Sequence, residues 1–116
     1  MKSMNEDALS SRQRAVSLLE CYEALLTDKQ REIMDDYYRY DLSLGEIAEN
    51  RNISRAGVYD TLKKSSEKLE DYESKLLLLA KKEEFGKKLE RIEQEEDPSK
   101  KLKAYQEFGK EITHGI

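Results

Sequence analysis

The side chains best suited to binding lie between Arg51 and Lys68, where five basic residues stand against two acidic ones. Arginine and lysine reach the phosphates of nucleic acids, and a positive surface also suits docking to a protein. Both kinds of partner stay open at this point. The candidate contact residues are Arg51, Ser54, Arg55, Ala56, Tyr59, Asp60, Lys63 and Lys64.

The charge of the whole chain argues against strong binding to DNA. The net charge of the 116-residue chain is −4, and residues 1–42 carry six basic and nine acidic side chains. DNA-binding domains that act alone are usually basic, because phosphate contacts supply most of their non-specific affinity. We therefore predict nucleic-acid binding that is modest and salt-sensitive, without tight sequence-specific binding to duplex DNA.

Catalysis is not expected from this sequence. The only histidine is His114, near the C-terminus, and the only cysteine is Cys21. One of each cannot form a zinc site within a single chain, and that histidine supports no Ser–His–Asp arrangement. The glycine-rich loops that cradle phosphates are also missing from the sequence. We expect no enzyme activity, no metal ion and no cofactor.

The same composition predicts a cytoplasmic protein that does not insert into membranes. The longest apolar run, from Leu76 to Ala80, has five residues, far fewer than a membrane-spanning helix needs. The first residues contain acidic side chains and lack the apolar stretch of a signal peptide. A single cysteine cannot form an intramolecular disulfide, which is typical of a reducing compartment.

Two short helices joined by a tight turn are expected to position the candidate contacts. Ser43 can cap the first helix, with Glu46 in the capping-box position, and Ser54 can cap the second. Asn52 tolerates the left-handed backbone conformation that the turn needs. The pattern predicts a helix-turn-helix, although an ordinary helical hairpin has similar features. The residues predicted to be buried are Ile47, Ala48, Ile53, Val58 and Leu62.

Two further helices are expected to precede this pair. A helical spacing of apolar residues that starts at Leu9 predicts a bracing helix over about residues 6–25. Thr27, with Gln30 in the capping-box position, predicts a second helix that ends near Tyr40. The fold class predicted for the chain is therefore all-α, with a trihelical core braced by the N-terminal helix.

Aromatic residues end the second of these helices. Tyr37, Tyr38 and Tyr40 are side chains that could stack on nucleic-acid bases. Aromatic residues at helical spacing more often pack in a core and send the hydroxyl group to water. We favour core packing for all three tyrosines.

An apolar stripe continues from Val58 to Leu79 with heptad-like spacing, interrupted by Ser65. The second helix of the pair is expected either to run on towards Leu79 or to kink near Ser65 and Ser66. Packing on the N-terminal helix and pairing with a second copy of the chain are competing uses of this stripe. We favour packing within the chain, with a homodimer formed at the Leu76–Leu79 end, because one small domain cannot easily bury four consecutive leucines.

The chain is expected to divide into a helix-turn-helix domain over residues 1–80 and a charged helical extension over residues 81–116. From Lys81 to Lys110 there are nine basic and eight acidic residues, consistent with solvated helix faces held by pairs such as Glu84–Lys88. Asp97 and Pro98 suit the cap and first position of a last helix. That helix has a weak apolar stripe, so the extension is expected to dock on the body or on a partner. The residues of the stripe are Leu102, Tyr105, Phe108 and Ile112.

The stretch of about residues 19–78 closely resembles the YlxM-like family of small bacterial proteins. The most specific matching pieces are Leu26-Thr27-Asp28-Lys29-Gln30, Tyr37-Tyr38, Asp41-Leu42-Ser43-Leu44, Glu46-Ile47-Ala48-Glu49, Ser54-Arg55, Val58-Tyr59-Asp60 and Leu69-Glu70-Asp71-Tyr72-Glu73. Proteins of this family look like the helix-turn-helix region 4 of sigma factors, in the winged-helix-like DNA-binding superfamily. The resemblance implies a sigma-region-4-like core.

The resemblance also implies a role. Genes of the family typically lie beside the gene of the signal recognition particle GTPase. The resemblance therefore implies a regulator or adaptor of that pathway, with the GTPase, its RNA or both as partners. The second hypothesis is a transcription regulator that binds duplex DNA through Arg55, Tyr59 and Lys63. Salt discriminates between these partners, because binding through several phosphates weakens steeply with salt and a protein interface responds less.

Two positions depart from the family pattern in the second helix of the predicted helix-turn-helix. The family usually has Gln-Ala after Ser-Arg, whereas this chain has Ala56-Gly57. Ala56 cannot read an adenine edge as a glutamine can, and a helical Gly57 costs about 1 kcal/mol relative to alanine. Asn52 replaces the usual glycine of the turn, which is a mild change. These departures argue against direct reading of bases and leave the predicted fold intact.

Overall fold

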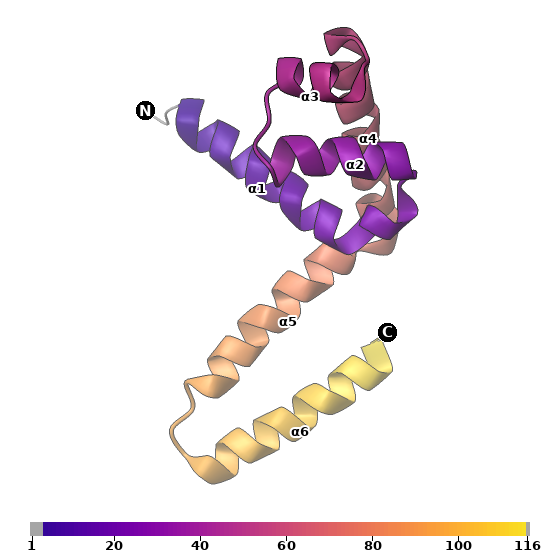
Figure 1. Cartoon of the computed structure of the whole chain (residues 1–116). Helices are drawn as coiled ribbons and strands as arrows, with labels where there is room; N and C mark the ends of the chain where they lie inside the picture. The colour runs from indigo at the N-terminus through magenta and orange to yellow at the C-terminus, as the bar shows by residue number, and fades with distance from the viewer. Residues whose placement is uncertain (1–3, 116) are drawn as a thin grey trace. The chain divides into compact units, whose positions relative to one another are not determined.

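The computed structural model describes the backbone of residues 4–115 and the side chains of residues 9–114. The described part is all-α and contains no strand, as predicted. It divides into two compact units, Met1–Leu79 and Ala80–Ile116, called here the helix-turn-helix unit and the hairpin unit. The elements are α1 (Met4–Tyr22), a 3-10 turn (Glu23–Leu25), α2 (Asp28–Tyr38), α3 (Leu44–Arg51), α4 (Arg55–Leu76), α5 (Leu78–Glu93) and α6 (Pro98–Gly115) (Figure 1).

The core of the helix-turn-helix unit forms where α4 packs against α1, α2 and α3. Leu19, Ile33 and Ile47 are fully buried in it, one from each of the first three helices. The prediction that the Val58–Leu79 stripe packs within the chain is confirmed, because α4 contributes Val58 and Leu69 to the same cluster. Burial of these aliphatic side chains is the main stabilising term of the unit.

Helix α1 braces the unit, but its stripe begins later than the sequence suggested. Leu9 is 56% exposed, whereas Leu18 and Leu19 are buried. The first turns of α1 extend beyond α2 (Figure 1). Arg14 on the same helix makes a bidentate ion pair with Glu70 of α4, with N–O distances of 2.7 and 2.9 Å. This pair helps to fix α1 on α4.

The predicted helix caps of α2 and α3 are confirmed. At the start of α2, the Gln30 amide donates to Thr27 Oγ1 at 3.2 Å, and the Thr27 amide donates to Gln30 Oε1 at 3.1 Å. Ser43 and Glu46 make the same reciprocal pair at the start of α3, with both distances 3.1 Å. These contacts, chiefly with the Ser43 backbone, lower the pKa of Glu46. Each capping box satisfies two backbone donors that have no partner within the helix.

Helix α4 continues unbroken through Ser65 and Ser66 and ends at Leu76. The alternative in which the helix runs on towards Leu79 is therefore confirmed as far as Leu76, and the alternative with a break near Ser65 and Ser66 is wrong. Ser65 is fully buried, and its hydroxyl donates to the Thr61 carbonyl at 2.6 Å, which satisfies the group without a kink. The break lies at Leu77, which adopts the left-handed conformation with φ 55°.

A buried hydrogen-bond network explains why the helix breaks at Leu77. The hydroxyl of Tyr22 donates to Glu73 Oε1 at 2.5 Å. The Leu78 amide donates to the Tyr22 hydroxyl at 3.1 Å, and the Leu79 amide donates to Glu73 Oε1 at 3.0 Å. These side chains thus satisfy the first backbone donors of α5, which otherwise lack partners. The network offsets the cost of a leucine in the left-handed region.

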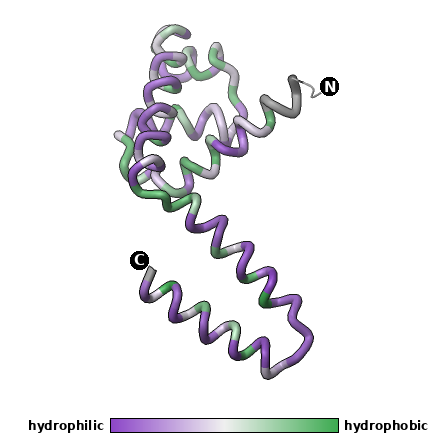
Figure 2. The backbone as a smooth tube through the Cα atoms, turned by 180° about the vertical axis from the view of Figure 1, so that it is seen from behind, coloured by the Kyte–Doolittle hydropathy of each residue, from purple (hydrophilic) through white to green (hydrophobic). Residues whose placement is uncertain are grey.

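The leucines at this junction differ in burial. Leu79 is buried in the core, whereas Leu76, Leu77 and Leu78 are each about half exposed. Figure 2 shows the hydrophobic colouring of the chain where α4 passes into α5. A homodimer that covers these leucines stays a prediction.

The hairpin unit consists of α6 and the part of α5 from Ala80 onward. Asp97 and Pro98 begin α6 as predicted, and Asp97 Oδ1 accepts a hydrogen bond from the Ser99 amide at 3.0 Å. The Phe85 and Phe108 rings meet edge to face, with centroids 5.5 Å apart. Of the predicted stripe on α6, Phe108 is buried and Ile112 half-buried, whereas Leu102 and Tyr105 are exposed. A face-to-face pair of helices covers only a narrow strip of each.

Candidate nucleic-acid or partner interface

The turn between α3 and α4 has the geometry that the sequence predicted. Asn52 is left-handed, with φ 54° and ψ 48°. The Ile53 amide donates to the Ala48 carbonyl at 3.0 Å and the Asn52 amide to the Glu49 carbonyl at 3.3 Å. These two bonds form a Schellman motif, which ends α3 and aims the chain into α4.

Four of the five residues predicted to be buried around this turn are buried. They are Ile47, Ala48, Val58 and Leu62. Ile53 is only half-buried, so the prediction was wrong for this residue. Ile53 lies in the turn itself, where one side of the side chain packs on the core and the other side faces away from it.

Ser54 caps α4, as predicted. Its Oγ accepts a hydrogen bond from the Gly57 amide at 2.9 Å. A Cβ atom at position 57 would lie 3.1 Å from Ser54 Oγ, which is a tight contact. Gly57 therefore leaves room for the capping side chain. In return, a glycine inside the helix costs stability relative to alanine.

The outward face of α4 carries a row of three predicted contact residues. Arg55, Tyr59 and Lys63 are exposed and follow one another at intervals of four residues, so they lie on one side of the helix. Arg55 and Lys63 are separated by about 12 Å along the helix axis. Within residues 9–114, neither cation has an ion pair or a hydrogen bond from its side chain. Ala56 is exposed beside the row.

Asp60 and Lys64 form an exposed ion pair on α4, with an N–O distance of 3.0 Å. Opposite charges four residues apart on a helix attract each other weakly in water. In this pair the ammonium group of Lys64 neutralises part of the negative charge of Asp60 next to the row, and Lys64 is no longer a free cation. The row itself therefore carries the uncompensated positive charge of this face.

Arg51 lies apart from the row and joins α3 to α2. Its guanidinium donates to both oxygens of Asp36, at 2.6 and 3.2 Å, and to Glu32 at 3.1 Å. The hydrogen bond to Asp36 raises the pKa of Arg51. Asp36 is buried, so this pair stabilises the packing of α2 on α3, and the guanidinium is engaged before any phosphate arrives.

A groove borders the row on the side of α2 and α3. Its volume is about 300 Å³, within the range of sites that bind small groups. The residues that line it are Tyr37, Tyr38, Leu44, Tyr59, Leu62, Lys63 and Ser66. Sequence reasoning assigned Tyr37 and Tyr38 to the core, and both pack on it while also lining this groove. Tyr40 was wrongly assigned to the core, because α2 ends at Tyr38 and Tyr40 is 70% exposed in the turn that follows.

Arg12 is the part of this region that sequence reasoning missed. Its guanidinium lies 5.7 and 5.5 Å from the ring centroids of Tyr37 and Tyr38 and donates to their carbonyl oxygens at 2.9 and 3.0 Å. It also pairs with Asp41 at 3.1 Å. The contacts are made across 25 residues or more of sequence, so no local pattern signals them.

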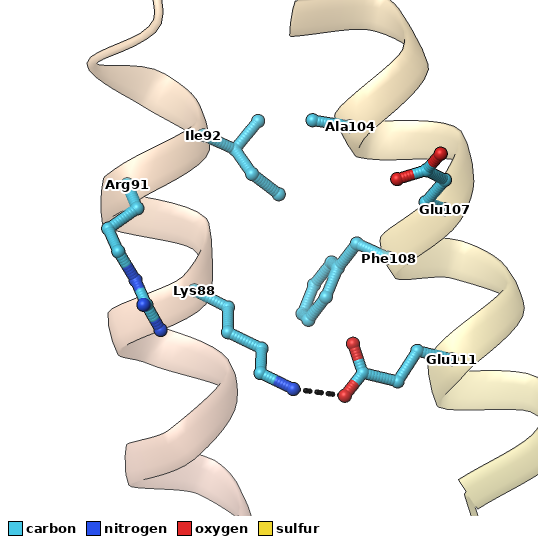
Figure 3. Close-up of a pocket in the computed structure, with 7 residues that line it drawn as sticks. All are labelled: Lys88, Arg91, Ile92, Ala104, Glu107, Phe108 and Glu111. Carbon is cyan, nitrogen blue, oxygen red and sulfur yellow. Dashed lines mark hydrogen bonds and ion pairs between the residues drawn. The ribbon is translucent and has the colours of Figure 1, made fainter.

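A second pocket, of about 380 Å³, lies between α5 and α6 of the hairpin unit. Figure 3 shows Ile92, Ala104 and Phe108 facing the space between the helices, with the Lys88–Glu111 ion pair at one end. The hydrogen bond to Glu111 raises the pKa of Lys88, so the amine stays protonated. The charged groups of the pair satisfy each other, and the pocket lining supplies no nucleophile with an adjacent base.

Within the described part of the chain, no three histidine, cysteine, aspartate or glutamate side chains gather as a metal site would require. No helix there is both long and apolar enough to span a bilayer. The exposed face of α4 and the groove beside it therefore remain the main candidate for a functional surface.

Comparison with known proteins agrees with this geometry. The family model of YlxM / p13-like helix-turn-helix proteins matches residues 9–108. The chain is 57% identical over 74 residues to a UPF0122 protein of Caldanaerobacter subterraneus, a match that covers 64% of this chain and 63% of the relative. It is 55% identical over 64 residues to a UPF0122 protein of Halalkalibacterium halodurans, covering 55% and 59% of the two chains. A UPF0122 protein of Bacillus thuringiensis is 54% identical over 67 residues, covering 58% and 61%.

The matched segment contains the whole α3–turn–α4 motif and every residue of the candidate face. The chain covers less than two thirds of the length of these relatives, and their names state no activity. Both the match and the observed turn geometry thus support the same assignment. The chain belongs to the YlxM / p13-like family of helix-turn-helix proteins.

Proposed function

We propose that this chain is a regulatory or adaptor protein of the signal recognition particle pathway. In this proposal the exposed face of α4 binds the RNA of the particle, its GTPase, or both. The pathway comes from the resemblance to YlxM-like proteins, whose genes typically lie beside the gene of that GTPase. The protein acts as a binding module in the cytoplasm and has no catalytic role.

The observation that carries the proposal is the row of Arg55, Tyr59 and Lys63 on α4. Within the described residues the two cations have no acidic partner, whereas most other arginines of the helix-turn-helix unit are paired with acids. An uncompensated cation is available to a phosphate or to an acidic protein surface. The row stands on a helix that packs on three others, so its geometry is fixed before binding.

A pull-down from bacterial extract, with and without nuclease, tests the proposal directly. We expect the GTPase, the RNA of the particle or both to be enriched, and Arg55→Ala with Lys63→Ala to reduce the enrichment. Loss of the signal after nuclease treatment identifies RNA as the primary partner. Absence of both partners from the bound fraction, with the protein folded, would contradict the assignment to this pathway.

A transcription regulator is the second candidate, and the capped helix pair favours it. In helix-turn-helix regulators the second helix enters the major groove of DNA. Within the described residues, this face of α4 offers two unpaired cations, Arg55 and Lys63, and Ala56 cannot read a base edge, so duplex binding is expected to be weak. A sequence-specific complex with duplex DNA at nanomolar affinity in about 0.15 M salt would place this candidate first.

A further inference from the structure

We infer that the groove beside α4 binds an unpaired base of an RNA loop or bulge, with an adjacent phosphate held by Lys63. This inference rests on the proposed function and states which part of an RNA the α4 face recognises. It extends the candidate site from the exposed helix face to residues of α2 and α3. The argument begins with the aromatic lining of the groove.

Three tyrosines line the groove, two from the end of α2 and one from α4. Tyr37, Tyr38 and Tyr59 surround a volume of about 300 Å³, together with the aliphatic Leu44 and Leu62. Aromatic side chains with aliphatic neighbours are the usual surface on which proteins stack single bases. Tyr59 is 59% exposed, so a large part of this side chain is free for contact.

The tyrosine pair on α2 is held in place before any ligand binds. The Tyr37 and Tyr38 rings stand at 88° to each other, with centroids 4.9 Å apart. The Arg12 guanidinium lies against both rings and donates to both carbonyl oxygens. Because these side chains are already ordered, binding a base costs less conformational entropy than it would in a loose pocket.

The charges around the groove favour an anionic ligand. Lys63 lines the groove, and Arg55 lies on the same face two turns towards the start of α4. Asp60, which lies on α4 beside the row, is paired with Lys64. A base in the groove thus has a cation beside it for its own phosphate. Arg55 is available for a second phosphate, about 12 Å away along the helix.

The lining favours an unpaired nucleotide over a duplex. In a duplex the faces of the bases are covered by their stacked neighbours, so tyrosine rings in a concave groove cannot reach them. An unpaired base in a loop or bulge has a free face. Ser66 adds a hydroxyl group to the lining, which suits hydrogen bonding to a ribose 2′-hydroxyl.

The test uses the full chain and three probes of matched sequence. They are an RNA hairpin with 2-aminopurine among its unpaired nucleotides, a fully paired RNA duplex, and the DNA version of the hairpin. Fluorescence anisotropy measures affinity, and the 2-aminopurine signal reports stacking of the base. We expect the RNA hairpin to bind more tightly than either of the other probes, with a change in 2-aminopurine fluorescence.

Two variants with matched controls assign the effect to the groove. Tyr59→Ala should weaken binding of the RNA hairpin about 5- to 150-fold and abolish the fluorescence change, because stacking on one aromatic ring is lost. Tyr40→Ala removes an exposed tyrosine outside the groove and should bind as the wild type does. Lys63→Gln should lower the salt slope by about 0.7, the value for one single-strand phosphate, and Lys29→Gln should leave it unchanged. Lys29, Tyr59 and Lys63 lie in helices, which alanine and glutamine suit, and Tyr40 is exposed in a turn, so these proteins should stay folded.

The outcomes separate this inference from the proposed function. If the wild type binds the hairpin and Tyr59→Ala binds it equally well, the groove is not the site and only this inference fails. Preference for the paired duplex would also overturn it, and equal binding of the DNA hairpin would overturn the assignment to RNA. If the wild type binds none of the probes at low salt but captures the GTPase, the inference fails while the pathway assignment stands.

Discussion

The two units of the chain have similar amphipathic helices but very different burial. In the helix-turn-helix unit, α4 packs on three helices, and seven hydrophobic side chains of the core are 1% exposed or less, among them Leu19, Ile33 and Leu69. In the described part of the hairpin unit, Phe108 is the only buried side chain. Along α5 and α6 short hydrophobic segments alternate with longer polar ones (Figure 2).

The difference shows that an apolar stripe predicts a helix more reliably than it predicts a core. A stripe is buried only where a second and a third element cover it. In the helix-turn-helix unit three helices meet on α4, so the stripe is covered and the opposite face is held rigidly for binding. The hairpin unit offers one facing helix, so its stripe stays partly open.

The largest expected effect comes from deleting matched leucine side chains in the two units. Leu19→Ala should lower the free energy of unfolding by about 2–5 kcal/mol, because Leu19 is fully buried and its removal leaves a cavity. Leu102→Ala should change it by less than about 0.5 kcal/mol, because Leu102 is 60% exposed. Urea denaturation followed by circular dichroism measures both. Equal losses for the two variants would remove the contrast between the units.

Next in size is Tyr22→Phe, at the junction where α4 passes into α5. The variant loses the hydroxyl that donates to Glu73 and accepts from the Leu78 amide, so both groups lose a buried partner. We expect a loss of about 1–3 kcal/mol in the free energy of unfolding at neutral pH. Denaturation curves that superimpose on those of the wild type would show that this network does not stabilise the end of the helix-turn-helix unit.

The same variant has a defined dependence on pH. Burial, and then the hydrogen bond to Glu73, raise the pKa of Tyr22 above its ordinary value of 10.0. Below about pH 10 the tyrosine is protonated in both folded and unfolded chains, so the stabilisation is complete. Above that pH the unfolded chain loses the proton first, so the wild type loses this stabilisation as pH rises through the raised pKa. The difference between the wild type and Tyr22→Phe should therefore shrink above pH 10 in denaturation experiments.

A smaller effect is expected from ion pairs of different burial. Arg51→Ala leaves the buried Asp36 without its bidentate partner and should cost about 1–2 kcal/mol. Lys88→Ala removes the exposed pairs with Glu84 and Glu111 in the hairpin unit, and its unfolding curve should match that of the wild type. Thermal melts at low and high salt provide the measurement. A larger loss for Lys88→Ala than for Arg51→Ala would reverse the comparison.

The smallest expected effect concerns the helix caps. Ser43→Ala removes the oxygen that accepts from the Glu46 amide, so α3 should lose about 1 kcal/mol of stability. Asp97→Ala removes the equivalent acceptor of α6 and should increase hydrogen exchange only in the first turn of that helix. Hydrogen exchange read residue by residue distinguishes the two. Protection lost throughout the helix-turn-helix unit in Asp97→Ala would show that the units unfold together.

Local signals in the sequence determined most helix boundaries and the position of the motif. Thr27, Ser43 and Ser54 each accept the cap hydrogen bond that their type and spacing predict. Asn52 takes the left-handed conformation expected for the turn. These features depend on contacts between residues at most five apart, which is why a single sequence suffices to predict them. The exposed positions of Arg55, Tyr59 and Lys63 also follow from helical spacing alone.

Only the tertiary structure decided where charges are neutralised and where the long helix ends. Arg51 looked free for phosphates in the sequence, but the fold places Asp36 and Glu32 against its guanidinium. The break at Leu77 depends on the buried hydroxyl of Tyr22, which lies 56 residues from the amide that it accepts. The groove likewise joins side chains of α2, α3 and α4. Such contacts cannot be read from local spacing, because the packing of whole helices brings together residues that are distant in sequence.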